Sequence, residues 1–184
     1  MRIISGKYRG RRIETFQDKA LRPTMGVTRE AMFNILSHGQ FADLLPGCRV
    51  LDLFCGCGTF SMEALSRGAA HVTCIDIKSE HLQVARENIA YINETEHATF
   101  IRTDSTNPPP AKTPCNLIFL DPPYYKNLAL PTLQNALKAG WLTPDAVVVI
   151  ETGAKEECPP PEGFGEYETR KYSNSRIHIF KRMG

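Results

Sequence analysis

Long apolar runs are absent from this 184-residue sequence: no stretch approaches the roughly 18–20 apolar residues that a membrane-spanning helix requires. A secretory signal is absent as well, because the segment after Met1, RIISGKYRGRRI, is charged from its first residue. A strong excess of charge is also missing, since 22 Lys and Arg residues stand against 20 Asp and Glu residues. These absences argue against a membrane protein, a secreted protein and a uniform polycation. They predict a cytoplasmic protein.

The spacings that announce a metal centre are lacking too. No two cysteines form a CxxC pair, which is the usual spacing of a structural zinc site. The histidines share no spacing either. We therefore expect no metal site, and we expect reduced structural thiols, as is usual in a cytoplasm. The six cysteines are Cys48, Cys55, Cys57, Cys74, Cys115 and Cys158.

What the sequence does contain, from about residue 46 onward, is an alternation of apolar runs with segments of helical periodicity. Such runs are typical of strands buried on both faces, and hence of a parallel α/β sheet covered by helices. The final segment reads as two strands joined by an SNS turn, which predicts an antiparallel hairpin. Strands are predicted over residues 48–54, 71–77, 98–104, 115–121 and 146–152, helices over 59–68, 79–93 (with Ser79 as N-cap) and 128–142, and the hairpin over 166–182.

Residues 1–45 are predicted to be a basic N-terminal extension of the domain formed by residues 46–184. Their first part resembles a short β-ribbon turning at Gly6 or Gly10, and their second part has helical periodicity. Basic residues cluster here before and after the first acid, Glu14, as on a surface that follows phosphates. The alternative is a solvated edge strand whose charges only prevent aggregation. The predicted RNA contacts are Arg2, Lys7, Arg9, Arg11, Arg12, Arg22 and Arg29.

The segment VLDLFCGCG, residues 50–58, places Asp52 near the end of a strand and two glycines at the turn into a helix. Glycines let a ligand approach the backbone, and a helix N-terminus offers free N–H groups. A dinucleotide site would have a third glycine where Ser61 stands, and Asp52 would repel a pyrophosphate. The acid suits instead the cationic methionine end of S-adenosylmethionine. The predicted cofactor contacts from this loop are Asp52, Phe54, Cys55, Gly56 and Gly58.

Aspartates also end the next three strands, so four carboxylates should share the rim of a parallel sheet at which ligands bind. Asp76 lies where a nucleotide site places an acid against ribose hydroxyls. Asp104, with the Ser105 backbone beside it, could meet an adenine amino group. Metal binding is the competing use of clustered acids, but no histidine stands at these positions and methyl transfer from a sulfonium requires no metal. The predicted cofactor contacts here are Asp76, Ile77, Asp104 and Ser105.

The stretch LDPPYY, residues 120–125, ends an apolar strand with an acid, two prolines and two tyrosines. Each proline fixes φ at about −65° and lacks an N–H, and a residue before proline is held extended. The Asp121 carboxylate and the Pro122 carbonyl could therefore accept both hydrogens of an exocyclic amine and aim its lone pair at a sulfonium methyl. Tyr124 offers a face on which an extruded base can stack. The predicted catalytic residues are Asp121, Pro122, Pro123 and Tyr124.

With RIISGKYRGRRI, LRPT, TREAMFNIL, VLDLFCGCG, CID, RTD and LDPPYY in this order, nearly the whole chain resembles the bacterial small-subunit ribosomal RNA guanine-N2 methyltransferases. These are class I S-adenosylmethionine-dependent enzymes. The resemblance implies a Rossmann-like, mostly parallel seven-stranded sheet with a C-terminal antiparallel hairpin. It also implies 16S ribosomal RNA in a small-subunit assembly particle as substrate, and a monomer. One departure is Gly26-Val27, where the family commonly has Asp-Arg.

Three other functions compete with this interpretation. A DNA adenine-N6 or cytosine-N4 methyltransferase could use the same Asp-Pro-Pro-Tyr geometry, although the chain has no room for a separate target-recognition domain. A nucleic-acid-binding module with a vestigial cofactor pocket is the non-catalytic alternative. A nicotinamide dehydrogenase would have no use for DPPY. A cytosine-C5 mechanism through Pro114-Cys115 is disfavoured, because Cys115 begins the strand that Asp121 ends.

Overall fold

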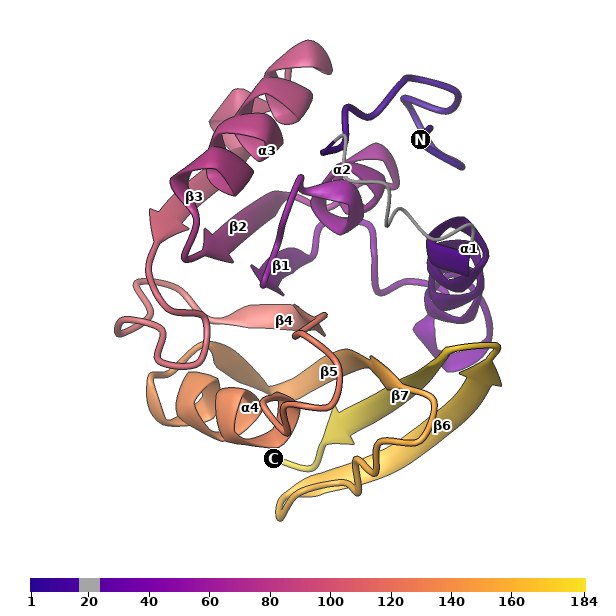
Figure 1. The fold of residues 1–184 in the computed structure, drawn as a ribbon, viewed down its shortest axis with the longest axis vertical. Coiled ribbons are helices and arrows are strands. Elements are labelled where there is room, and N and C mark those ends of the chain that lie inside the picture. The colour runs from indigo at the N-terminus through magenta and orange to yellow at the C-terminus, as the bar shows by residue number, and fades with distance from the viewer. Residues whose placement is uncertain (17–23) are drawn as a thin grey trace.

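The computed structural model describes residues 1–16 and 24–184, and within them seven strands form one mixed sheet in the order β3-β2-β1-β4-β5-β7-β6 (Figure 1). β1, β2, β3, β4 and β5 run parallel, whereas β7 is antiparallel to both β5 and β6. The predicted parallel sheet with a terminal antiparallel hairpin is therefore confirmed. The strands are β1 (Arg49–Leu53), β2 (His71–Asp76), β3 (Ala98–Arg102), β4 (Cys115–Leu120), β5 (Leu142–Gly153), β6 (Phe164–Tyr172) and β7 (Ser175–Arg182).

Helices cover both faces of this sheet. Alternate residues of β4 show the division, because Leu117 and Phe119 belong to one apolar cluster whereas Ile118 and Leu120 belong to the other. The first cluster takes side chains from α1, α2 and α3, and the second takes them from α4. No helix in the described part of the chain is long and apolar enough to cross a bilayer. The helices are α1 (Thr24–Leu36), α2 (Thr59–Ser66), α3 (Ser79–Tyr91) and α4 (Ala129–Lys138), with the 3-10 turns η1 (Gly39–Phe41) and η2 (Thr95–His97).

The N-terminal segment is a short antiparallel ribbon, as its sequence predicts: the Ile3 N–H donates to the Arg11 carbonyl and the Ile13 N–H to the Met1 carbonyl, each at 2.9 Å. Its only β-bridge among the described residues joins Arg2 and Arg12. Gly6 and Gly10 both have φ of +84°, so the chain reverses at both of the glycines considered from the sequence. At Gly6 the backbone runs against the end of α2, where the Lys7 N–H donates to the Ser66 carbonyl at 2.7 Å. This contact ties the turn of the ribbon to the end of α2.

The same segment is anchored in the main core. Ile3 and Ile13 are fully buried in the cluster that also contains α1 and α2 side chains. The N–H groups of Ile4 and Ser5 donate to the buried carboxylate of Glu63 at 2.8 and 3.0 Å. Two backbone donors of the N-terminal turn are thereby satisfied by a helix residue that is distant in sequence.

The helices end two to four residues before their predicted limits, and the N-cap of α3 differs from its prediction. α3 begins at Ser79, so Lys78 is the N-cap residue and has no side-chain capping bond. The Ser79 hydroxyl contacts Glu80 instead, and the Lys78 N–H is satisfied by the Asp76 carboxylate at 2.9 Å. The cap is thus supplied by the strand-end aspartate, two residues before the helix N-cap.

All six cysteines are buried and none is in a disulfide. Cys115 lies at the start of β4, at the opposite end of the strand from Asp121, and its N–H donates to the Trp141 carbonyl at 2.7 Å. Burial raises the pKa of the Cys115 thiol to about 11 and that of Cys48 to about 12. Cys115 is therefore a neutral core thiol, as the sequence predicts.

Candidate active site

Three acidic residues from three neighbouring strands face one cavity at the carboxyl ends of the parallel strands. Asp52 of β1 pairs with Phe119 of β4, and the last pair between β4 and β5 is Leu120 with Ile150. Asp121 and Glu151 are therefore the next residues along these two strands. Because alternate residues of a strand face the same way, Asp52, Asp121 and Glu151 all lie on the face covered by α1 and α2. All three line a cavity of about 260 Å³.

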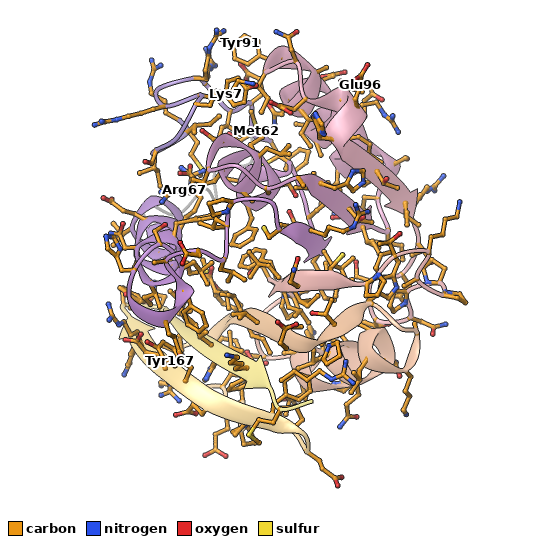
Figure 2. The ribbon with its side chains drawn as sticks, turned by 180° about the vertical axis from the view of Figure 1, so that it is seen from behind. Lys7, Met62, Arg67, Tyr91, Glu96 and Tyr167 are labelled. Carbon is orange, nitrogen blue, oxygen red and sulfur yellow. The ribbon has the colours of Figure 1, made fainter. Side chains whose placement is uncertain are left out.

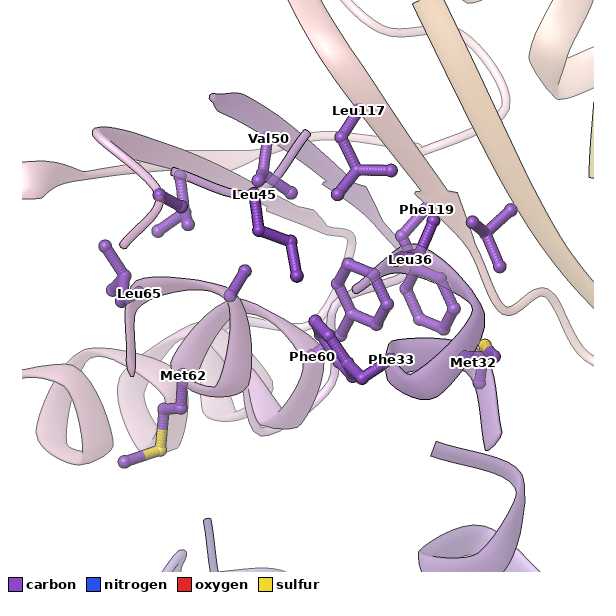
Figure 3. Packing of buried hydrophobic residues seen from close by; sticks show 14 of the residues in the cluster. Met32, Phe33, Leu36, Leu45, Val50, Phe60, Met62, Leu65, Leu117 and Phe119 are labelled. Atoms are coloured by element: carbon purple, nitrogen blue, oxygen red, sulfur yellow. The ribbon is translucent and has the colours of Figure 1, made fainter. Parts of the chain in front are cut away.

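Aromatic rings form part of the wall of this cavity. Phe60 of α2 stacks on Phe119 of β4 with ring centroids 3.8 Å apart and planes inclined by only 2° (Figure 3). Phe33 of α1 packs against Phe60 from behind the cavity lining, at 4.6 Å between centroids. The N-terminal segment contributes Thr15 and Phe16 to the lining. The cavity is therefore enclosed by the sheet, by α1 and α2, and by the residues just before position 17.

A second, more open cavity of about 580 Å³ adjoins the first along the same rim. The two cavities share Phe54, Gly56, His81, Asp121 and Glu151, and together they are called the rim cleft below. The rim cleft brings together ten of the thirteen predicted cofactor-binding and catalytic residues, all except Gly58, Asp104 and Ser105. The ten are Asp52, Phe54, Cys55, Gly56, Asp76, Ile77, Asp121, Pro122, Pro123 and Tyr124.

The two loop glycines have different surroundings. Gly56 has φ of +53°, and a Cβ built there would meet nothing within 4 Å, so its backbone faces open space in the cleft. At Gly58, by contrast, a Cβ would lie 3.1 Å from the Cβ of Ala85 in α3. Phe54 also has a positive φ, +63°, which is unusual for an aromatic residue and typical of functional loops. Gly56 and Phe54 thus shape the cleft, whereas Gly58 allows α2 to start close to α3.

Asp52 is a buried acid whose hydrogen bonding is incomplete. One carboxylate oxygen, Oδ2, accepts the Ser61 hydroxyl at 2.6 Å. The other, Oδ1, is buried and has no partner among the described residues. Burial, only partly offset by the Ser61 hydrogen bond, raises the pKa of Asp52 to about 7. A buried carboxylate oxygen without a partner on a cavity wall suits a cationic ligand group.

Asp76 joins the glycine loop to α3. Its Oδ2 accepts the Gly56 N–H at 2.9 Å, and its Oδ1 accepts the Lys78 N–H at the same distance. The Nδ1 of His81 lies 3.0 Å from Oδ2, and the His81 ring packs against Phe16 at 4.4 Å between centroids. Asp76 therefore links the glycine loop to the start of α3 and fixes this edge of the cleft.

Two other predicted cofactor contacts lie outside the lining of the rim cleft. The exposed Asp104 carboxylate accepts the N–H and hydroxyl of Thr106, so it caps its own turn. Ser105 is buried, and its hydroxyl oxygen accepts the Phe54 N–H at 3.1 Å. Ser105 therefore positions the strained Phe54 from beneath.

The DPPY segment is tied to β5. The Tyr124 hydroxyl donates to Oε1 of Glu151 at 2.5 Å. Burial, together with the nearby carboxylates of Glu151 and Asp121, raises the pKa of Tyr124 above its usual value, so this hydroxyl stays protonated. Tyr125 has φ of +61° and is 59% exposed, and its ring lies against the backbone of Gly153.

The predicted RNA contacts are divided between the surface and the cleft. Arg29 of α1 is only 5% exposed and lines the first cavity. Its Nη2 donates to the Arg2 carbonyl at 2.6 Å, while its Nε and Nη1 have no partner among the described residues. Arg22 lies outside the described residues. The exposed members are Arg2, Lys7, Arg9, Arg11 and Arg12.

These five exposed residues, called the basic turn below, lie at the far end of α3 from the cleft. Lys7 forms an ion pair with Glu94 at 3.2 Å, and Arg11 lies over the Tyr91 ring at 5.5 Å (Figure 2). Both partners lie at or just beyond the C-terminus of α3, whose N-terminus is at the rim cleft. α3 has 13 residues and is about 20 Å long, so the basic residues and the rim cleft lie roughly this far apart.

Residues 1–181 match the family described as conserved hypothetical protein 95. The chain belongs to this family. It is 35% identical to "Putative rRNA methyltransferase YlbH" of Bacillus subtilis over all of both proteins. It is 32% identical to "Ribosomal RNA small subunit methyltransferase D" of Escherichia coli, over 86% of this chain and 78% of that one.

The fold agrees with that of solved methyltransferase structures. "Putative methyltransferase yhhF" of Escherichia coli superimposes with a TM-score of 0.83 at 27% identity, over 99% of this chain and 97% of that one. This member of the conserved hypothetical protein 95 family therefore has the class I methyltransferase fold, and it is related to ribosomal RNA methyltransferases. A methyltransferase of this class uses S-adenosylmethionine, and the unpartnered Asp52 oxygen and the open Gly56 backbone fit that group.

Two titratable residues of the cleft, Glu151 and His81, are not among the predicted site residues. Glu151 ends the apolar part of β5 as Asp121 ends β4, so strand-end position on a fifth strand is the signal that marks it. His81 carries no signal in the sequence, because the histidines share no spacing. Within residues 1–16 and 24–184, no cluster of three or more His, Cys, Asp or Glu side chains could hold a metal.

Proposed function

We propose that this protein transfers a methyl group from S-adenosylmethionine to the exocyclic N2 amine of a guanine in 16S ribosomal RNA. The observation that carries the proposal is the rim cleft, in which the Asp121-Pro122-Pro123-Tyr124 segment lies beside the glycine loop and Asp52. The names of the relatives support the RNA substrate.

Bound S-adenosylmethionine supplies an electrophilic methyl group on a sulfonium. Asp52, Phe54, Cys55, Gly56, Asp76 and Ile77 hold it, with Asp52 facing its cationic amino-acid end. Three other predicted contacts do not line the cleft: Asp104, Ser105 and Gly58. The Ser105 hydroxyl holds Phe54 in position, and Gly58 allows α2 to start close to α3.

Asp121 and Pro122 orient the target amine. The amine lone pair is delocalised into the purine ring, so the nitrogen is a poor nucleophile until its hydrogens are held. The Asp121 carboxylate and the Pro122 carbonyl accept these hydrogens, and their fixed positions leave little reorganisation for the reaction. With its hydrogens held, the nitrogen would present its lone pair to the methyl group that S-adenosylmethionine supplies when bound, and the released proton would pass to Asp121 or water.

Residues 1–45 act as the RNA-contacting extension of the catalytic domain formed by residues 46–184. The exposed cations Arg2, Lys7, Arg9, Arg11 and Arg12 bind phosphates at a distance from the cleft, so the RNA footprint extends along α3. The protein acts as a monomer, and its substrate is a small-subunit assembly particle rather than isolated RNA.

Labelled S-adenosylmethionine tests this function when it is offered with unmethylated small subunits, naked ribosomal RNA and duplex DNA, each followed by nucleoside analysis. We expect N2-methylguanosine from the small subunits. Label in DNA adenine or cytosine would support the DNA methyltransferase instead. Bound cofactor with no labelled nucleoside from any substrate would support a non-catalytic module.

A further inference from the structure

The acid Glu151 stands beside the proposed catalytic Asp121, and the chemistry above gives it no task. Leu120 and Ile150 are a registered pair of neighbouring parallel strands, and Asp121 and Glu151 follow them directly. Adjacent strands lie roughly 4.8 Å apart. The two carboxylates therefore face the rim cleft side by side, and both line each of its cavities.

Glu151 is held in place more firmly than a solvated strand-end acid. It is only 7% exposed, and the Tyr124 hydroxyl donates to its Oε1 at 2.5 Å. Because the pKa of Tyr124 is raised, that hydroxyl remains a donor. A carboxylate has about four acceptor sites, so Glu151 can accept from more than one donor group.

Guanine, adenine and cytosine each carry an exocyclic amine, but they differ at a ring nitrogen beside the carbon that bears this amine. In guanine the ring nitrogen N1 beside the N2 amine carries a hydrogen, so N1 and N2 together present two adjacent donors. In adenine and cytosine the corresponding ring nitrogen carries a lone pair. Two adjacent carboxylates present acceptors only, so they match the guanine edge and repel the lone pair of the other two bases.

We propose that Glu151 is the residue that selects guanine, by accepting its N1–H while Asp121 and the Pro122 carbonyl take the N2 hydrogens. The inference rests on the proposed function and names the side chain that reads the base. Tyr124 fixes the Glu151 carboxylate, and Asp121 performs the chemistry. The pair thus separates recognition from catalysis across two neighbouring strands.

The test replaces the target guanosine by 2-aminopurine in reconstituted small subunits and compares methyl transfer by the parent protein and Glu151→Gln. 2-Aminopurine keeps the N2 amine but has a lone pair at N1. The parent protein should favour guanine by at least about tenfold, the usual scale for a good polar contact to a base. Glu151→Gln should reduce this preference at least about tenfold, because its amide can donate to the N1 lone pair.

Tyr124→Phe is the matched control. It removes the hydroxyl that fixes Glu151 but keeps the carboxylate and the aromatic ring, so the guanine preference should fall much less than in Glu151→Gln. A Glu151→Gln protein that loses activity equally on both bases would overturn the proposal and make Glu151 a support for Tyr124. A parent protein that methylates neither base would instead refute the proposed function, so the two failures are distinguishable.

Discussion

At the residue scale, Asp52 is the clearest physical mark of a charged ligand. A carboxylate this deeply buried is destabilised unless a partner completes its hydrogen bonding, and its Oδ1 has none among the described residues. Burial raises its pKa to about 7. The free protein therefore holds a large fraction of Asp52 protonated at neutral pH, and a bound cation would favour the ionised form.

Cofactor affinity should consequently depend on pH. Binding of the cationic end requires ionised Asp52, so affinity should rise about fivefold between pH 6 and pH 7 as the carboxyl loses its proton, below the pH at which the amine of the ligand loses its own. Calorimetric titration with S-adenosylmethionine at several pH values measures this. In Asp52→Asn the affinity should be lower and this pH dependence absent. An unchanged pH profile in that variant would show that Asp52 does not face the cofactor.

The residue scale also shows the limits of sequence reasoning. The glycine loop and DPPY identified most of the cleft, because turn glycines and prolines constrain the backbone locally. Strand-end position alone could not separate Asp76, which lines the cleft, from Asp104, which caps its own turn. Nor could composition show that Arg29 is buried, since burial depends on how α1 packs.

At the element scale, the strands and helices from residue 46 onward follow from apolar periodicity, because a buried parallel sheet requires continuous apolar runs. The way in which the N-terminal turn packs against α2 could not be predicted from the same periodicity. Its shape depends on Glu63 and Ser66 of α2, about 60 positions away, and local pattern carries no information on such partners.

The two glycines of this turn form a natural matched pair for substitution. Both have φ of +84°, but a Cβ at Gly6 would lie 1.9 Å from the Ser66 carbonyl oxygen, whereas one at Gly10 would meet nothing within 4 Å. Gly10→Ala should cost about 1–2 kcal/mol of unfolding free energy from backbone strain alone. Gly6→Ala should cost about 1–3 kcal/mol more, because backbone must move.

Denaturant titration of the two variants and the parent measures these differences. Equal destabilisation would mean that the contact between the N-terminal turn and the end of α2 contributes little to the fold.

At the scale of the whole molecule, the basic turn and the rim cleft lie at opposite ends of α3. Removing residues 2–12 would also remove Ile3 from the core, so deletion cannot separate RNA affinity from stability. Neutralising charges is the cleaner test. Arg9 and Arg11 are exposed and form no ion pair among the described residues, unlike Lys7 and Arg12.

The double variant Arg9→Gln, Arg11→Gln should bind ribosomal RNA more weakly and with a shallower salt dependence. Loss of two phosphate contacts lowers the slope of log K against log salt by roughly 1.4–1.8. The matched control is Lys112→Gln, Lys138→Gln, which removes two exposed charges elsewhere. If the control lowers the slope as much, the basic turn has no special role in RNA binding.

The most direct test of the central claim measures cofactor binding and single-turnover methyl transfer in one preparation of Asp121→Ala. Asp121 is proposed to orient the target amine while other residues hold the cofactor. Transfer should fall at least about a hundredfold, the usual scale for losing one preorganised hydrogen-bonding group, while the cofactor affinity stays within about threefold of the parent. Transfer at the parent rate, or loss of cofactor binding, would contradict the role given to the Asp121-Pro122-Pro123-Tyr124 segment.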